Sequence, residues 1–137
     1  MYLIYCVDEK GGLSFGGRRQ SRDRTVRGDM LEMTAGKTLW MDETSRRQFT
    51  EPEGERIRVD EDFLSRAGAG EFCFVEDRPA LPWLDRVEGV VLYHWNRTYP
   101  ADRYLDVPPL EHGFRLEKTE EFPGYSHEKI TKEVYVK

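Results

Sequence analysis

The sequence predicts an α/β fold with three layers (αβα), in which helices cover a mixed, mostly parallel sheet that ends in an antiparallel hairpin. Through the first two thirds of the chain, apolar strand-like segments alternate with helix-like segments, which is typical of parallel sheets. In the last third, apolar and charged residues alternate at period two, as in antiparallel strands with one face in water. The chain has 137 residues, of which 38% are hydrophobic, so we expect a single domain spanning residues 1–137.

The first element is a strand over residues 2–7, whose nearly continuous apolarity predicts burial on both faces. Glycines then interrupt all periodicity, so residues 8–20 are expected to form a long, irregular loop. A helix follows over about 22–34, because apolar residues recur there at helical spacing and either Ser21 or Asp23 can cap its start.

Shorter elements complete the predicted sheet. Strands are expected at residues 38–41, 57–59, 71–75 and 89–95, with short helices following Asp42 and Asp60 and a short helical piece before Asp85. The final hairpin is expected to contain residues 114–116 and 130–136, where the period-two alternation occurs.

Composition limits the cellular environment and the class of partner. Cys6 and Cys73 each lie in an apolar run without a C-x-x-C partner, so we expect buried, reduced thiols and a cytoplasmic location, although a disulfide is possible if their strands are neighbours. No stretch approaches the roughly 20 apolar residues of a membrane helix. The net charge of −5 argues against bulk electrostatic capture of nucleic acid.

The most unusual local feature is an arginine-rich segment that contains five arginines within residues 18–27. Arginine makes bidentate contacts to phosphate and carboxylate, and glycines before a helix leave backbone N–H groups free to join them. The segment therefore predicts a site for an anionic ligand, formed by Arg18, Arg19, Gln20, Arg22, Asp23, Arg24 and Arg27.

Two other interpretations of these arginines remain open. They can pair with surplus acids on a solvated face or across a subunit contact, or an arginine–acid network can close a cleft. The acids considered for such pairing are Asp29, Glu32, Glu43 and Asp77.

Ser126-His127-Glu128 places three catalytic residue types side by side. Neighbours on a strand point to alternate faces, so we expect no proton relay among them.

Several short matches, together with the order of elements, resemble the dihydrofolate reductase family. Val7-Asp8 is followed by glycines at positions 11 and 12, as at the end of that family's first strand, and residues 91–94 are similar to a later strand. Ser126-His127 precedes the last strand, as in the family's final hairpin. The resemblance runs from residue 1 to residue 137 and implies a dihydrofolate reductase-like fold, in which the arginine-rich loop and the first helix border the substrate cleft.

The family's functional residues are not matched in this chain. A reductase of the family needs a carboxylate in the first helix where Val26 or Arg27 stands, and the nearest acid, Asp23, is better explained as a helix-start residue. Dinucleotide binding needs a Gly-Arg-x-Thr-like turn where residues 42–45 read Asp-Glu-Thr-Ser, and a Gly-Gly turn where Glu76-Asp77 stands. We therefore expect no cofactor, no catalytic residue and no metal, and a binding or structural module rather than an enzyme.

Alternative functions are a diverged reductase that uses Asp23, a nucleotide-processing enzyme in the same cleft, or a protein that contacts RNA through its arginines. Similar short bacterial chains have been called ribonuclease Z, whose zinc chemistry needs an H-x-H-x-D-H cluster. Only His94, His112 and His127 occur here, each isolated, so that activity is not expected. The expected partner is a phosphate- or carboxylate-bearing small molecule; nucleic acid and membrane are not expected, and a protein partner is left open.

Overall fold

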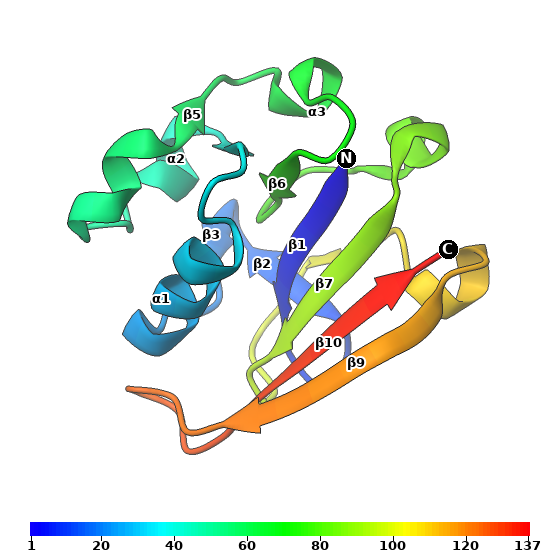
Figure 1. Ribbon diagram of the computed structural model, residues 1–137. Helices are drawn as coiled ribbons and strands as arrows, with labels where there is room; N and C mark the ends of the chain where they lie inside the picture. Colours follow the sequence, from blue (N-terminus) through cyan, green and yellow to red (C-terminus); the bar gives the residue numbers. More distant parts are fainter.

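The computed structural model describes residues 1–137 and has an α/β fold built on a seven-stranded mixed sheet (Figure 1). The strand order is β5-β4-β6-β1-β7-β10-β9. These strands are β1 (Tyr2–Val7), β4 (Leu39–Met41), β5 (Arg58–Val59), β6 (Phe72–Phe74), β7 (Gly89–His94), β9 (Arg115–Phe122) and β10 (Ile130–Val136). The helices are α1 (Arg24–Met33), α2 (Glu43–Arg46) and α3 (Phe63–Arg66), with 3₁₀ turns η1 (Pro52–Arg56), η2 (Leu81–Arg86) and η3 (Pro109–His112).

The direction of the strands changes where the sequence pattern changes. β1 runs parallel to both β6 and β7, and β4 runs parallel to β5 and β6. β10 is antiparallel to both β7 and β9. Figure 1 shows these three strands side by side at one edge of the sheet. The predicted α/β class, with a mixed sheet and a C-terminal antiparallel hairpin, is confirmed.

β1 lies inside the sheet and is buried on both faces. Leu3 and Tyr5 belong to one core cluster of 18 residues, whereas Ile4 belongs to a second cluster of 14 residues on the other face. Successive side chains of a strand point to opposite faces, so a strand between two cores must be apolar at nearly every position, as the sequence predicted.

The layers that cover the two faces are unequal. α1, the one helix longer than a single turn or so, buries Val26, Met30 and Leu31 in the 14-residue core. The other face is covered by α3, by apolar side chains of η2 and by Leu13 from a small second sheet. One helix of ten residues therefore covers part of one face, and only short helices and turns cover the other.

The predicted irregular loop over residues 8–20 is wrong in one respect, because it contains a hairpin. β2 (Gly12–Phe15) pairs antiparallel with β3 (Arg18–Arg19) and with β8 (Arg103–Tyr104). Gly16 and Gly17 join β2 to β3 with φ values of 59° and 75°. A two-residue turn of this kind requires positive φ at both positions, which glycine adopts without strain.

Neither cysteine forms a disulfide. Cys6 and Cys73 are free, and although β1 and β6 are neighbours, the residue opposite Cys73 is Leu3. Burial raises the pKa of both thiols, that of Cys73 to about 12. No helix is long and apolar enough to span a bilayer.

Candidate functional site

The candidate site lies beyond the carboxyl ends of the parallel strands. From β1 the chain passes through α1 to β4 on one side, and it later adds β7 on the opposite side of β1. Ligand sites of open α/β sheets occur where the strand order reverses in this way. Two polar cavities lie in this region, one beside the start of α1 and the other beyond β4 and β6.

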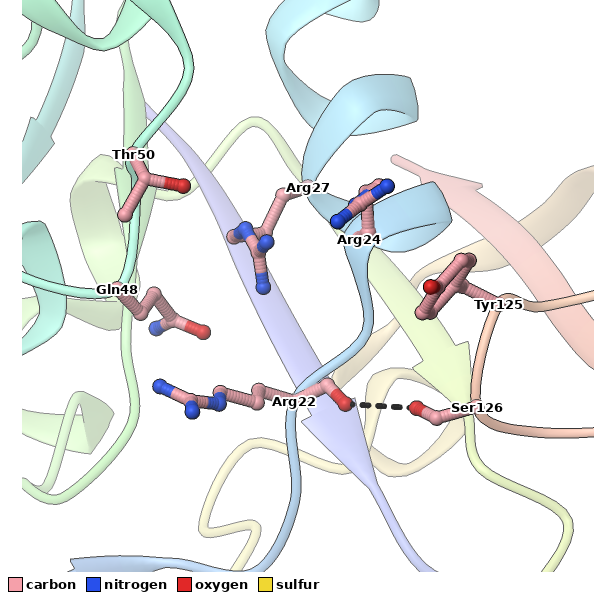
Figure 2. A pocket seen from close by; sticks show the side chains of 7 residues that line it. All are labelled: Arg22, Arg24, Arg27, Gln48, Thr50, Tyr125 and Ser126. Carbon is pink, nitrogen blue, oxygen red and sulfur yellow. Dashed lines mark hydrogen bonds between the residues drawn. The ribbon is translucent and has the colours of Figure 1, made fainter.

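The first cavity, which we call the arginine pocket, has a volume of about 330 Å³. Three chain segments build it: the start of α1, the stretch after α2, and the turn before β10 (Figure 2). One hydrophobic residue, Tyr125, is present in its lining. The lining residues are Arg22, Arg24, Arg27, Gln48, Thr50, Tyr125 and Ser126.

The three arginines of this pocket differ in how their charges are balanced. Arg27 forms an ion pair with Glu51, at 3.2 Å from Nε to Oε2. The guanidinium of Arg24 lies 4.4 Å from the ring centroid of Tyr125, a cation–π contact that leaves its charge in place. Arg22 and Arg24 form no ion pair with any carboxylate. The pocket therefore carries two exposed arginines that have no ion-pair partner.

Asp23 ties the walls of the pocket together. Its Oδ1 caps α1 by accepting hydrogen bonds from the backbone N–H groups of Thr25, at 2.8 Å, and Val26, at 3.4 Å. The same carboxylate accepts hydrogen bonds from the N–H groups of Tyr125, at 3.0 Å, and Ser126, at 2.8 Å. One buried side chain thus fixes the turn before β10 against the start of the helix.

These hydrogen bonds also determine the charge of Asp23. Burial alone would raise its pKa, but donors from Tyr125, His127, Ser126 and Thr25 outweigh burial and hold the pKa well below the usual range of a carboxyl group. Asp23 is therefore ionised at neutral pH. Two of its hydrogen-bond donors are backbone N–H groups at the start of α1, which Asp23 therefore already satisfies. The sequence-based expectation that such N–H groups are free to bind an anion is wrong at these positions.

His127 reinforces the same junction. Its Nδ1 lies 2.9 Å from Oδ2 of Asp23, while its Nε2 lies 3.1 Å from the hydroxyl of Ser21 and 3.0 Å from that of Tyr99. The indole of Trp95 stacks on the imidazole, with ring centroids 4.5 Å apart. This order of hydroxyl, imidazole and carboxylate resembles a catalytic triad.

Ser21 and His127 line neither the arginine pocket nor the ion-paired pocket. Through its contact with Asp23, His127 joins the turn before β10 to the start of α1. The argument from alternating faces was wrong for Ser126 and His127, because residues 125–128 form a bend that precedes β10 and both side chains contact Asp23. Glu128 is exposed and takes no part in these contacts.

The second cavity, which we call the ion-paired pocket, has a volume of about 210 Å³ and no hydrophobic residue in its lining. Arg19 pairs with Glu76 at 3.0 Å, and Arg78 pairs with Asp42 at 2.6 Å. Its charged lining residues are Arg19, Asp42, Glu61, Glu76, Asp77 and Arg78. Acids outnumber arginines here, and each arginine faces a carboxylate.

The structure divides the predicted site residues among several places. Arg22, Arg24 and Arg27 come together in the arginine pocket, with Asp23 behind its wall. Arg19 lies in the ion-paired pocket. Arg18 is exposed on β3, and the amide of Gln20 donates to the buried carboxylate of Asp8 at 3.0 Å.

None of the four acids that the sequence suggested pairs with this segment. Asp29 contacts Lys132, Glu43 contacts Arg47, and Asp77 contacts Arg103, whereas Glu32 forms no ion pair. The arginine–acid network that does exist uses Glu51 and Glu76 instead.

Four lining residues of the arginine pocket were missed from the sequence, namely Gln48, Thr50, Tyr125 and Ser126. They are isolated polar or aromatic residues far along the chain from the arginines, and no local pattern marks them. No cluster of three or more His, Cys, Asp or Glu side chains is placed to hold a metal ion.

Comparison with known proteins supports the fold alone. No protein-family model matches the chain, and no curated protein matches it by sequence. Among solved structures, a dihydrofolate reductase from Enterococcus faecalis, complexed with NADP(H) and RAB-propyl, matches with a TM-score of 0.67 and 14% identity. The match covers 98% of this chain and 94% of the reductase. The expected dihydrofolate reductase-like fold is therefore confirmed at a level of sequence identity that indicates wide divergence.

Proposed function

We propose that this dihydrofolate reductase-like fold serves as a binding module for a small phosphate- or carboxylate-bearing ligand, held in the arginine pocket. The observation that carries the proposal is that Arg22 and Arg24 face a cavity without carboxylate partners. Guanidinium groups without a carboxylate partner are free to pair with the oxygens of an anionic ligand. An anion bound in the pocket would supply the missing partner.

The rest of the pocket lining is suited to the same ligand. Gln48 is only 6% exposed, and its side chain extends toward Arg22 (Figure 2). The hydroxyl of Thr50 can donate a hydrogen bond to an anionic oxygen, whereas that of Ser126 already donates to the carbonyl oxygen of Arg22 or to Asp23. Guanidinium groups recognise phosphate and carboxylate in a bidentate manner.

The ion-paired pocket supports the further proposal that the protein uses no dinucleotide cofactor. Glu76 and Asp77 follow β6, where the resemblance requires bare glycines beside a pyrophosphate. A carboxylate about 4 Å from a phosphate charge costs roughly 1 kcal/mol in water and about 4 kcal/mol in a partly shielded site. Arg19 and Arg103 offset part of this repulsion. Acids still outnumber arginines in the cavity, so its net charge opposes dinucleotide binding.

The alternative of a diverged reductase that uses Asp23 lacks support from the geometry. The carboxylate is buried, and both oxygens already accept hydrogen bonds from the protein. No specific observation favours RNA contact over a small ligand. The two free thiols are consistent with the proposed cytoplasmic location.

A thermal-shift titration tests the proposal. Phosphate and citrate at millimolar concentration should raise the melting temperature of the wild-type protein, and the double variant Arg22→Gln/Arg24→Gln should lose that response. Arg18→Gln, which removes an exposed arginine of the same segment outside the pocket, is the matched control and should respond as wild type. Stabilisation by NADPH or dihydrofolate that the double variant retains would contradict the proposal and indicate a reductase site.

A further inference from the structure

The proposed function leaves the ligand's chemistry open, and the pocket limits it further. Resting on that function, we infer that the ligand is an oligophosphate, with two or more linked phosphate groups and no bound base or ring. Charge distribution, size and the direction of the hydrogen-bond donors support this inference.

The charges of the pocket lie at separate points. Arg27 is already paired with Glu51, so Arg22 and Arg24 carry the uncompensated charges. Figure 2 shows Arg22 extending toward Gln48, whereas Arg24 lies beside Tyr125. A single carboxylate or phosphate can neutralise one of these guanidiniums, but an extended anion with charges on adjacent groups can neutralise both.

The size and polarity of the pocket disfavour a nucleotide. Its volume of about 330 Å³ is at the lower end of the roughly 300–1,000 Å³ that small-molecule sites occupy. Sites for ring-containing ligands are lined mostly by apolar side chains. Here Tyr125 is the only hydrophobic residue, it is 68% exposed, and the guanidinium of Arg24 already contacts its ring. No second aromatic ring lines the pocket to stack on a base.

The hydrogen-bond donors favour phosphate over carboxylate. They come from two separate chain segments, the start of α1, represented by Arg22, and the stretch after α2, represented by Thr50, and thus approach the cavity from different sides. A tetrahedral phosphate presents oxygens in all of these directions, whereas a planar carboxylate presents them in one plane. The start of α1 adds little, because Asp23 already caps it.

Isothermal titration calorimetry at constant ionic strength tests the inference with orthophosphate, pyrophosphate, tripolyphosphate, citrate and ATP as probes. We expect pyrophosphate and tripolyphosphate to bind at least roughly tenfold more tightly than orthophosphate or citrate, since each engages a second charged hydrogen-bonding group. ATP should bind no more tightly than tripolyphosphate. In Arg22→Gln or Arg24→Gln, the preference for pyrophosphate over orthophosphate should disappear, whereas Arg18→Gln should keep it.

The outcomes separate this inference from the function on which it rests. Equal affinity for orthophosphate and pyrophosphate, or tighter binding of citrate, would overturn the oligophosphate while leaving an anion site in place. ATP binding more than tenfold tighter than tripolyphosphate would also overturn it, because the base would then contribute. Absence of binding by every anion would overturn the proposed function and the inference together.

Discussion

The arginine pocket and the ion-paired pocket draw on the same arginine-rich segment but treat its charges in opposite ways. Arg19 enters the ion-paired pocket and meets Glu76, whereas Arg22 and Arg24 enter the arginine pocket and meet no carboxylate. The number of arginines in a segment therefore says little about binding. What distinguishes a site from a structural network is whether a carboxylate lies opposite each guanidinium.

The two pockets should also differ in what they contribute to stability. The Arg19–Glu76 pair is partly shielded, with side chains 23% and 12% exposed, and such pairs can stabilise the fold. Arg22 and Arg24 form no ion pair, so they add no comparable stabilisation.

The largest expected effect comes from removing the charge of Asp23, which supports the wall of the arginine pocket and has no part in the ion-paired pocket. Asp23→Asn should lower the free energy of unfolding by about 3 kcal/mol, because a buried carboxylate with several donors is lost. Asp77→Asn, beside the ion-paired pocket, is partly exposed and should cost less than about 1 kcal/mol. Urea denaturation of the two variants measures the difference, and equal losses would contradict the supporting role of Asp23.

The same variant should change the pH dependence of stability. The folded-state pKa of Asp23 is depressed, so its contribution is complete above the unfolded-state pKa of about 3.9 and is lost as the pH falls toward the folded-state value. The gap between wild type and Asp23→Asn should therefore narrow as the pH is lowered from 5 to 3. A gap that stays constant over that range would show that the carboxylate charge is not its source.

Gly124 offers a second way to disturb the wall of the arginine pocket. An added Cβ would lie 2.8 Å from Oδ2 of Asp23 and 2.8 Å from the carbonyl oxygen of His127. Gly124→Ala should therefore cost roughly 1–3 kcal/mol and weaken anion binding, because the turn must shift. On α1, the Cβ added by Gly28→Ala meets nothing within 4 Å, so this variant should instead stabilise the protein by roughly 0.5–1 kcal/mol. Thermal melts should therefore show a lower melting temperature for Gly124→Ala and a higher one for Gly28→Ala.

Variants in each pocket should separate stability from anion binding. Because Glu76 loses its partner, Arg19→Gln should lower the free energy of unfolding by about 1 kcal/mol. It should leave anion affinity unchanged. Arg22→Gln/Arg24→Gln should change stability by less than about 0.5 kcal/mol and abolish anion binding. Chemical denaturation and calorimetry on the same samples measure both quantities. If either of these two variants lost both stability and anion affinity, the distinction between the pockets would be contradicted.

The smallest expected effect concerns Glu51, the one carboxylate that pairs with an arginine of the arginine pocket. Glu51→Gln should free Arg27 and strengthen pyrophosphate binding roughly threefold, since a partly exposed pair is worth less than about 1 kcal/mol. Weaker binding would mean that Glu51 holds Arg27 in its productive position. Calorimetry beside wild type decides between these outcomes.

The fold was more predictable from the sequence than the candidate site. β1, β7 and α1 were predicted because burial on both faces of a strand, or on one face of a helix, leaves a periodic pattern. The β2–β3 hairpin was missed although Gly16-Gly17 is a recognised signal for a two-residue turn. Its glycines were interpreted as interruptions rather than as the positive-φ positions that the turn requires.

The site was only half predictable, for a physical reason. The arginines lie close together in the sequence, and composition alone marks them. Gln48, Thr50 and Tyr125 reach the pocket through sheet topology, which no local pattern encodes. Whether an arginine is free or paired depends on acids from distant segments, such as Glu51 and Glu76, so this too required the structure.

The hydrogen bond between Asp23 and Tyr125 joins residues separated by 102 positions, and this separation has a consequence for folding order. Contacts between distant segments form late, because the chain between them must first be organised. The start of α1 can form early, but the arginine pocket closes only when the turn before β10 docks against it. A nascent or truncated chain that lacks residues 124–136 would therefore carry the arginines without the pocket, and anion binding would report completion of the whole sheet.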